Sequence, residues 1–244
     1  MCRLLGYSSS VPTNIPQFIG SEFSAFLELS NVHHDSWGLA INSGSETKVI
    51  KKAETAAISR EFPSVINETS GTGGLLHFRW ASPGLPVNQQ NAHPFSHGDV
   101  SFIHNGALSP YDALANLVSA DYMALRQGQT DSELFFLYLL TEISAKGFRV
   151  GVLDAIRNIK NNFKYSSINS MVMNSDFFIV ISEHDPANKP QWADEVYYEI
   201  RYRLDENGFA VASSGWDQTG WQLIENHKVL ILNRKSLELE LISL

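Results

Sequence analysis

The chain has 244 residues, enough for one large hydrophobic core or two small ones. Its formal net charge of -8 argues against a nucleic acid or an anionic membrane as partner, because either would attract a basic surface. Apolar residues make up 43% and charged residues 18%, which excludes disorder and coiled coil. We find no apolar run long enough to span a membrane and no signal peptide. Cys2 is the single cysteine, so a reducing, cytoplasmic location is expected.

The predicted elements begin with strands and become helical in the middle of the chain. The first half is predicted to contain a strand over 3–8, a helix over 21–30, and strands over 37–42, 47–52, 73–80 and 100–104. Helices are predicted over 131–145 and 150–162, and then strands over 168–173, 177–182, 196–204, 209–213, 228–233 and 236–243. Because the helices are grouped, we expect an α+β layered fold, with residues 2–244 forming one domain.

The helix over 131–145 has the clearest signals. Thr130 and Glu133 have the spacing of a capping box, and Gly147 provides a stop. Residues 134–140 are apolar nearly all round, so this helix is predicted to lie between other layers of the fold.

Cys2 is the first candidate for chemistry. A lone cysteine is ordinarily a small buried apolar residue, but position 2 allows removal of Met1, which would give Cys2 a free α-amine. An α-amine has a pKa of about 7.7–8.0 and a thiol about 8.5, so the two groups can exchange a proton. We therefore expect Met1 to be removed and the amine to serve as the base of an N-terminal nucleophile.

Other segments hold polar groups that have both a structural and a functional interpretation. Arg79 ends a strand before Pro83-Gly84, where it either forms a structural salt bridge or grips a carboxylate. Asn105-Gly106 is either a tight turn or a pair of donors for an oxyanion. Asp131 either complements the helix dipole or receives an ammonium group.

Taken together, these segments resemble a class II glutamine amidotransferase domain. The segments are Met1–Gly6, His34–Gly38, His77–Gly84, Asn91–Phe95, His104–Gly106 and Thr130–Glu133. Their order and spacing agree over roughly residues 2–140, whereas the last third resembles the family only as a continuation of the fold. The chain is similar to the short stand-alone members, namely bacterial glutamine amidotransferase-like proteins and the γ-glutamyl amidohydrolase of ergothioneine synthesis.

This resemblance implies a four-layer αββα Ntn-hydrolase sandwich. It also implies hydrolysis of a γ-glutamyl amide, either glutamine or a small conjugate, through a thioester on Cys2. Asn105 and Gly106 would then form the oxyanion hole. No cofactor and no metal is implied, and the expected partner is the small-molecule γ-glutamyl substrate.

The resemblance further implies how the substrate is held. Arg79 would bind its α-carboxylate and Asp131 its α-ammonium group, with the hydroxyl of Ser82 nearby. Residues 186–195 and 213–216 depart from the family pattern on the side expected for the leaving group. Candidates for an aromatic wall there are Trp192, Trp216 and Trp221.

Other functions stay open at this level. The domain could deliver ammonia to a separate synthase chain or form a homo-oligomer, although no acceptor domain fits in the remaining sequence, and hydrolysis is therefore favoured. It could also be an inactive regulatory module with the same fold. A zinc hydrolase built on His77, His93, His97 and His104 is a further alternative, but no metal-ligand spacing supports it.

Overall fold

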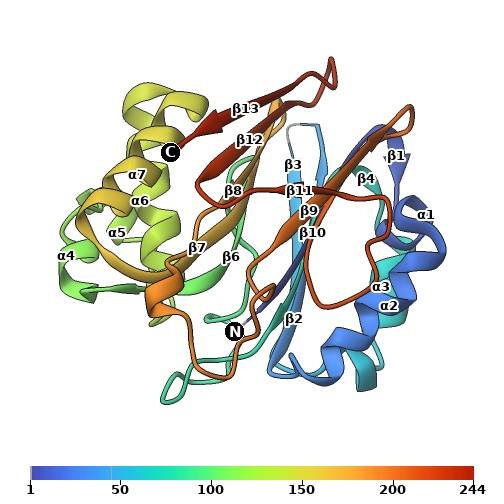
Figure 1. Ribbon diagram of the computed structural model, residues 1–244, viewed down its shortest axis with the longest axis horizontal. Coiled ribbons are helices and arrows are strands. Elements are labelled where there is room, and N and C mark those ends of the chain that lie inside the picture. The colour runs from blue at the N-terminus through green and yellow to red at the C-terminus, as the bar shows by residue number, and fades with distance from the viewer. Residues whose placement is uncertain (1, 45) are drawn as a thin grey trace.

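The computed structural model describes residues 2–44 and 46–244. Over these residues two antiparallel sheets pack face to face, and helices cover the outer face of each (Figure 1). In this view α4–α7 lie to the left of the sheets and α1–α3 to the right. The predicted four-layer αββα sandwich is thereby confirmed.

The first sheet places the N-terminal strand near its centre. In the described chain its order is β11 (Gln222–Ile224), β9 (Ile200–Asp205), β10 (Gly208–Ser213), β1 (Arg3–Thr13), β4 (Gly71–Arg79), β2 (Ser36–Ser43) and β3 (Glu46–Lys52). In the β1–β4 register Arg3 pairs with Phe78, so the start of β1 lies beside the end of β4. Cys2 and Arg79 therefore lie at the same end of these two neighbouring strands.

The second sheet faces the first across the middle of the molecule. Its order, again for the described residues, is β13 (Leu239–Ser243), β12 (Lys228–Asn233), β8 (Phe177–Ser182), β7 (Lys164–Met173), β6 (Val100–Ser109) and β5 (Phe95–His97). Asn105 on β6 pairs with Asn169 on β7. Consequently Asn105 sits within the sheet ladder, and the tight turn considered for Asn105-Gly106 does not form.

The helices are short except for two. The helices of the described chain are α1 (Ile15–Ile19), α2 (Phe23–Glu28), α3 (Phe62–Glu68), α4 (Tyr111–Ala115), α5 (Ala120–Met123), α6 (Asp131–Lys146) and α7 (Phe148–Asn162), and the last two are the long ones. Single 3₁₀ turns occur at η1 (Gly20–Glu22), η2 (Leu29–Asn31), η3 (Ala56–Ile58) and η4 (Pro186–Asn188). None of the helices in the described chain has both the length and the hydrophobicity needed to cross a membrane.

The cap predicted for α6 forms in part. The Thr130 hydroxyl accepts a hydrogen bond from the Glu133 backbone N–H at 3.1 Å, and Gly147 ends the helix. The Glu133 carboxylate instead accepts from the backbone N–H groups of Gln127 and Gly128, each at 2.7 Å. Glu133 thus fixes the loop before α6, which is a tertiary arrangement that capping-box spacing alone does not predict.

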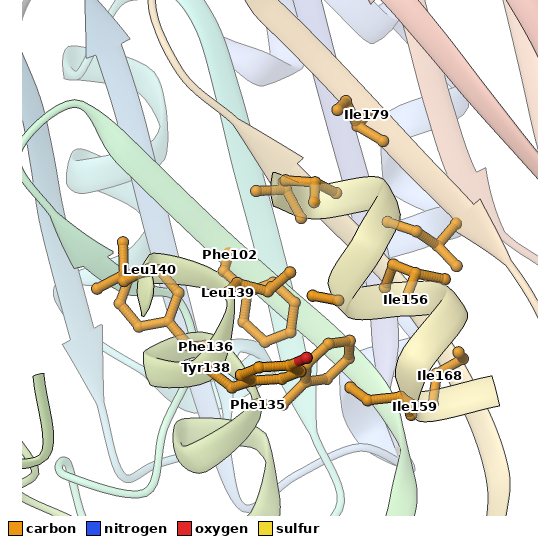
Figure 2. Packing of buried hydrophobic residues seen from close by; sticks show 14 of the residues in the cluster. Phe102, Phe135, Phe136, Tyr138, Leu139, Leu140, Ile156, Ile159, Ile168 and Ile179 are labelled. Carbon is orange, nitrogen blue, oxygen red and sulfur yellow. The ribbon is translucent and has the colours of Figure 1, made fainter. Parts of the chain in front are cut away.

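Three apolar layers hold the sandwich together. One lies between the sheets, one between the first sheet and α1–α3, and one between the second sheet and α6–α7. Figure 2 shows the last of these, where Phe135 and Tyr138 of α6 approach Ile156 and Ile159 of α7. Residues 134–140 are all buried, as predicted for a helix enclosed by other layers.

Several predicted elements have different bounds. The helix expected over 21–30 is divided into η1, α2 and η2. The strand expected over 196–204 begins only at Ile200, because residues 183–199 leave the sheet and form a long irregular segment. The elements β5, β11, α1, α3, α4 and α5 were not predicted.

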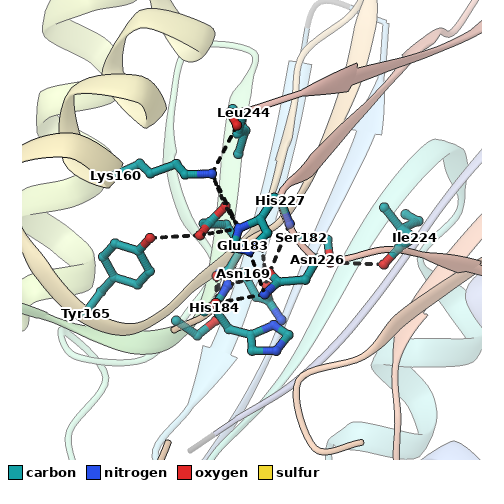
Figure 3. A network of polar contacts seen from close by, with 11 residues as sticks. Lys160, Tyr165, Asn169, Ser182, Glu183, His184, Ile224, Asn226, His227 and Leu244 are labelled. Atoms are coloured by element: carbon teal, nitrogen blue, oxygen red, sulfur yellow. Dashed lines mark hydrogen bonds and ion pairs between the residues drawn. The ribbon is translucent and has the colours of Figure 1, made fainter. Parts of the chain in front are cut away.

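The buried carboxylate of Glu183 connects the start of the irregular segment 183–199 to α7 and the C-terminus (Figure 3). Glu183 is fully buried, and its carboxylate lies 3.0 Å from Lys160 Nζ and 2.9 Å from His227 Nδ1. Tyr165 donates its hydroxyl to the same carboxylate at 2.8 Å. Burial raises the pKa of Tyr165, so its hydroxyl stays protonated and able to donate. Because a buried charge is costly unless paired, these contacts are needed for the segment to begin here.

Candidate active site

The site is centred on Cys2, which precedes β1 and is buried. Its backbone nitrogen donates a hydrogen bond to Asn105 Oδ1 at 2.8 Å. Since an N–H group can only donate, this contact fixes the oxygen of the Asn105 amide toward Cys2. Asn105 Nδ2 is buried and has no hydrogen-bond partner among the described residues. A buried amide donor is therefore left free beside the candidate nucleophile.

Gly106 follows Asn105 and packs closely against the neighbouring strand. A side chain there is excluded, because a Cβ atom would lie 1.8 Å from the backbone oxygen of Ser167 on the neighbouring strand β7. Gly106 lines a small cavity together with Cys2. This arrangement is suited to an oxyanion that lies close to the backbone.

Arg79, the last residue of β4, is buried at the same cavity. Its Nη1 donates to the backbone oxygen of Pro86 at 3.1 Å. Burial lowers the pKa of its guanidinium, while the charges of Cys2, Asp35 and Asp131 oppose that shift. No ion pair with Arg79 occurs in the described part of the chain, so the structural salt bridge considered for it does not form. The guanidinium contacts a loop carbonyl that an incoming carboxylate could replace.

Asp131 is the first residue of α6. Its Oδ2 accepts from the Leu108 backbone N–H at 2.7 Å, and its Oδ1 accepts from the Ser132 N–H at 2.9 Å. These bonds join the start of α6 to the end of β6 and fix the carboxylate at the cavity wall. Each carboxylate oxygen can accept more than one hydrogen bond, so Asp131 retains capacity for a bound cation.

The predicted site residues converge in space although they are far apart in sequence. Cys2, Arg79, Ser82, Gly106 and Asp131 line one cavity of about 30 Å³, and Asn105 contacts Cys2 from behind it. A volume of about 30 Å³ is roughly the share of a single water molecule in the liquid.

Asp35 is a site residue that the sequence did not assign. Its Oδ2 accepts from the Ala81 backbone N–H at 2.7 Å, and its own N–H donates to the Arg79 backbone oxygen at 3.0 Å. Asp35 thus positions the chain directly after Arg79. The sequence did contain an indication of this position for Asp35, because the segment His34–Gly38 resembles a segment near the family's site.

The histidines of the site form a stacked, buried group instead of a metal centre. His77 and His93 stack with ring centroids 4.2 Å apart, and His104 contacts Ser132 Oγ at 2.9 Å. His97 lies apart from them and contacts Tyr122. Burial lowers the pKa of both His77 and His93 well below 6.5, so both rings are neutral. Among residues 2–44 and 46–244, no cluster of His, Cys, Asp and Glu has an arrangement that could hold a metal ion.

The expected aromatic wall is only partly in place. Trp192 lies near the site, with its ring tilted against that of Trp80 at a centroid distance of 5.0 Å. Trp216 and Trp221 instead pack against each other at 5.3 Å, within the layer between the first sheet and its helices. Both contact the core cluster on the helix side of the first sheet and not the cavity of Cys2. The predicted removal of Met1 concerns a residue outside the described ones.

The fold and the position of the site define a class. Two antiparallel sheets between helical layers, with a cysteine at the start of a central strand, form the αββα sandwich of Ntn hydrolases. Residues 1–182 match the family model of class-II glutamine amidotransferases, which is about three quarters of the chain. The chain therefore belongs to the class-II glutamine amidotransferase family, whose members catalyse glutamine amide hydrolysis.

Individual relatives agree with this membership. A glutamine--fructose-6-phosphate aminotransferase of Chlorobaculum tepidum is 30% identical over 70% of this chain, which corresponds to 28% of that protein's length. A glutamine aminotransferase class-II domain protein from Silicibacter pomeroyi has the same fold, with a TM-score of 0.68 at 16% identity over 99% of both chains. Glutamine phosphoribosylpyrophosphate amidotransferase from B. subtilis gives a TM-score of 0.64 at 17% identity, covering 99% of this chain and 49% of the other.

Proposed function

We propose that this protein hydrolyses γ-glutamyl amides with Cys2 as an N-terminal nucleophile. The observation that carries the proposal is the contact between Cys2 N and Asn105 Oδ1, which leaves Asn105 Nδ2 unpaired beside the sulfur-bearing residue. One amide side chain can thereby hold the base and stabilise the transition state. We further propose that residues 2–244 act as one catalytic domain.

Once Met1 is absent, the Cys2 nitrogen is an amine that still donates to Asn105 Oδ1 and keeps its lone pair for the thiol proton. The sulfur then adds to the γ-carbonyl carbon, and the negative charge develops on the carbonyl oxygen. Asn105 Nδ2 and the Gly106 N–H are the proposed donors to that oxygen. When the C–N bond breaks, the ammonium on Cys2 returns its proton to the leaving nitrogen.

Water completes the reaction. It adds to the γ-glutamyl thioester while the Cys2 amine takes its proton, and collapse releases glutamate and regenerates the thiol. Arg79 and Asp131 bind the substrate's α-carboxylate and α-ammonium groups, and Ser82 contributes a hydroxyl to the cavity. For binding, the Pro86 carbonyl leaves Arg79 and a carboxylate with two oxygens replaces it.

The test is an amidase assay on protein whose first residue is shown by intact mass to be Cys2. Glutamine or γ-glutamyl methylamide should release glutamate, and an acid-quenched sample should carry a γ-glutamyl group on Cys2. Cys2→Ala should abolish turnover, whereas Cys2→Ser should leave a trace, because the hydroxyl is a poorer nucleophile at neutral pH. Full activity of protein that retains Met1 would exclude this mechanism.

A second candidate function is ammonia delivery to a separate synthase. It is favoured by the similarity to an aminotransferase of which this chain covers only 28%. In that case glutamine would be turned over appreciably only after a partner protein is added.

A further inference from the structure

A second cavity, of about 300 Å³, adjoins the one that contains Cys2. Its lining residues come from the loop after β4, the strands β6 and β7, and the segment between β8 and β9. They are Trp80, Ala81, Ser82, Pro83, Ala107, Ser166, Pro190 and Trp192. Trp80, Ala81 and Ser82 also line the cavity of Cys2, so the two spaces share a wall.

The second cavity is not at the amino-acid end of the substrate. Arg79 and Asp131, the proposed partners of the α-carboxylate and α-ammonium groups, line only the cavity of Cys2. Ala107 lines the second cavity and directly follows Gly106 of the proposed oxyanion hole. The acyl part and the leaving group lie on opposite sides of a carbonyl carbon, so this cavity is where the leaving nitrogen and its substituent would lie.

The wall formed by Trp192 is anchored beside the nucleophile. The rings of Trp192 and Tyr197 meet edge to face at 5.1 Å. The Arg3 guanidinium lies 4.0 Å above the Tyr197 ring, and Arg3 Nη1 donates to the Tyr197 backbone oxygen at 3.2 Å. Arg3 directly follows Cys2, so β1 fixes both the nucleophile and this wall. Trp192 itself remains 52% exposed, which leaves a large apolar surface for a ligand to cover.

We propose that this cavity binds the amine side of the substrate and that the preferred substrates are γ-glutamyl amides whose nitrogen carries a neutral, flat aromatic group. This inference rests on the proposed γ-glutamyl hydrolase function. The lining contains two tryptophans, two prolines and two alanines, with only the Ser82 and Ser166 hydroxyls as polar side chains. It therefore matches neither a charged acceptor nor ammonia, which needs no apolar space. A cavity of about 150 Å³ already suffices for benzene, so the present volume accommodates a substituted ring.

The test compares γ-glutamyl benzylamide with γ-glutamyl methylamide. Benzylamine is a weaker base than methylamine, so binding of the ring is reported by how far the ratio of kcat/KM values changes on substitution of Trp192, and not by the wild-type ratio alone. With Cys2-first protein we expect kcat/KM to favour the benzylamide at least about tenfold, as expected for a well-placed apolar group. Trp192→Ala should reduce this preference by about tenfold, and Trp192→Phe should retain most of it.

Two further variants define the site. Ala107→Leu should narrow the cavity and reduce turnover of the benzylamide more than that of the methylamide. Ile58→Ala, which removes another exposed apolar side chain outside both cavities, should leave the preference unchanged. In Cys2→Ala protein, titration calorimetry should show tighter binding of intact benzylamide than of intact methylamide.

The outcomes separate this inference from the proposed function. If the methylamide is hydrolysed but the benzylamide is favoured in neither rate nor affinity, the aromatic site is wrong and the hydrolase stands. If neither amide is turned over but the Cys2→Ala protein binds the benzylamide more tightly through Trp192, the aromatic site stands and the hydrolase is wrong. Turnover of glutamine alone, and only with a second protein, would overturn the aromatic site.

Discussion

The backbone nitrogen of Cys2 donates to the side-chain oxygen of Asn105 at 2.8 Å, across the interface between the two sheets. Cys2 directly precedes the central strand of one sheet, and Asn105 lies within the other. Packing of the two sheets therefore assembles the proposed nucleophile, base and oxyanion donor at one point. A change at Asn105 is expected to affect the chemical step more than substrate binding.

Substitutions at Asn105 should separate its two proposed roles. Asn105→Ala removes both the acceptor for Cys2 N and the Nδ2 donor, and kcat should fall by about 10²–10³. Asn105→Asp keeps an acceptor for Cys2 N but replaces the donor with negative charge, so its kcat should be lower still. Steady-state kinetics provide the measurement. An increase in KM with unchanged kcat in Asn105→Ala would contradict the oxyanion assignment.

Arg79→Lys should chiefly raise KM, by about 10- to 100-fold, with a smaller change in kcat. Lysine retains the charge but loses the second donor of the fork, and a hydrogen bond to a charged group contributes about 1.5–3 kcal/mol. The loss should depend on the substrate carboxylate. Competition by glutamate against turnover should weaken in parallel with KM, and unchanged inhibition by glutamate would argue against a carboxylate at Arg79.

The stacked histidines should make folding stability depend on pH below neutrality. Burial lowers the pKa values of His77 and His93 in the folded state, so the unfolded chain binds more protons once pH falls below about 6.5. Stability should be complete above that value and fall toward pH 5, by at most about 1.4 kcal/mol per pH unit for each ring. Urea unfolding at several pH values measures this.

A matched pair of variants tests the origin of that slope. In His93→Phe the dependence should decrease by about the contribution of one histidine, whereas His97→Ala, at a partly solvated edge strand, should retain it. Equal slopes in wild type and His93→Phe would show that the titration arises elsewhere.

Glu183→Ala should destabilise the protein by about 3 kcal/mol. The substitution leaves Lys160 and Tyr165 without the buried carboxylate that they contact, and loss of one partner from a buried pair is costly. Because Glu183 begins the segment that carries Trp192, limited proteolysis should also cleave residues 184–199 faster. Glu61→Ala, which breaks the exposed ion pair with Lys52, should change neither measurement appreciably. If Glu183→Ala unfolds like wild type, the network has no structural role.

The limits and burial of α6, and the order of the site segments, could be predicted from the sequence because they depend on local chemistry. The Thr130 cap, the Gly147 stop and the burial of residues 134–140 follow from neighbours within a few residues, and the structure confirms all three. The family resemblance likewise depends on short segments whose composition is visible in one dimension. These features do not require knowledge of which strands pair.

Which distant residues contact one another was decided only by the tertiary structure. The sequence grouped Trp192 with Trp216 and Trp221, but the latter two pack into the core, and Trp192 contacts Trp80 and Tyr197. The contact between Cys2 and Asn105 joins residues 103 positions apart. Such contacts are fixed by how the two sheets pack, and the free energy of that packing is spread over the whole interior and not over any local segment.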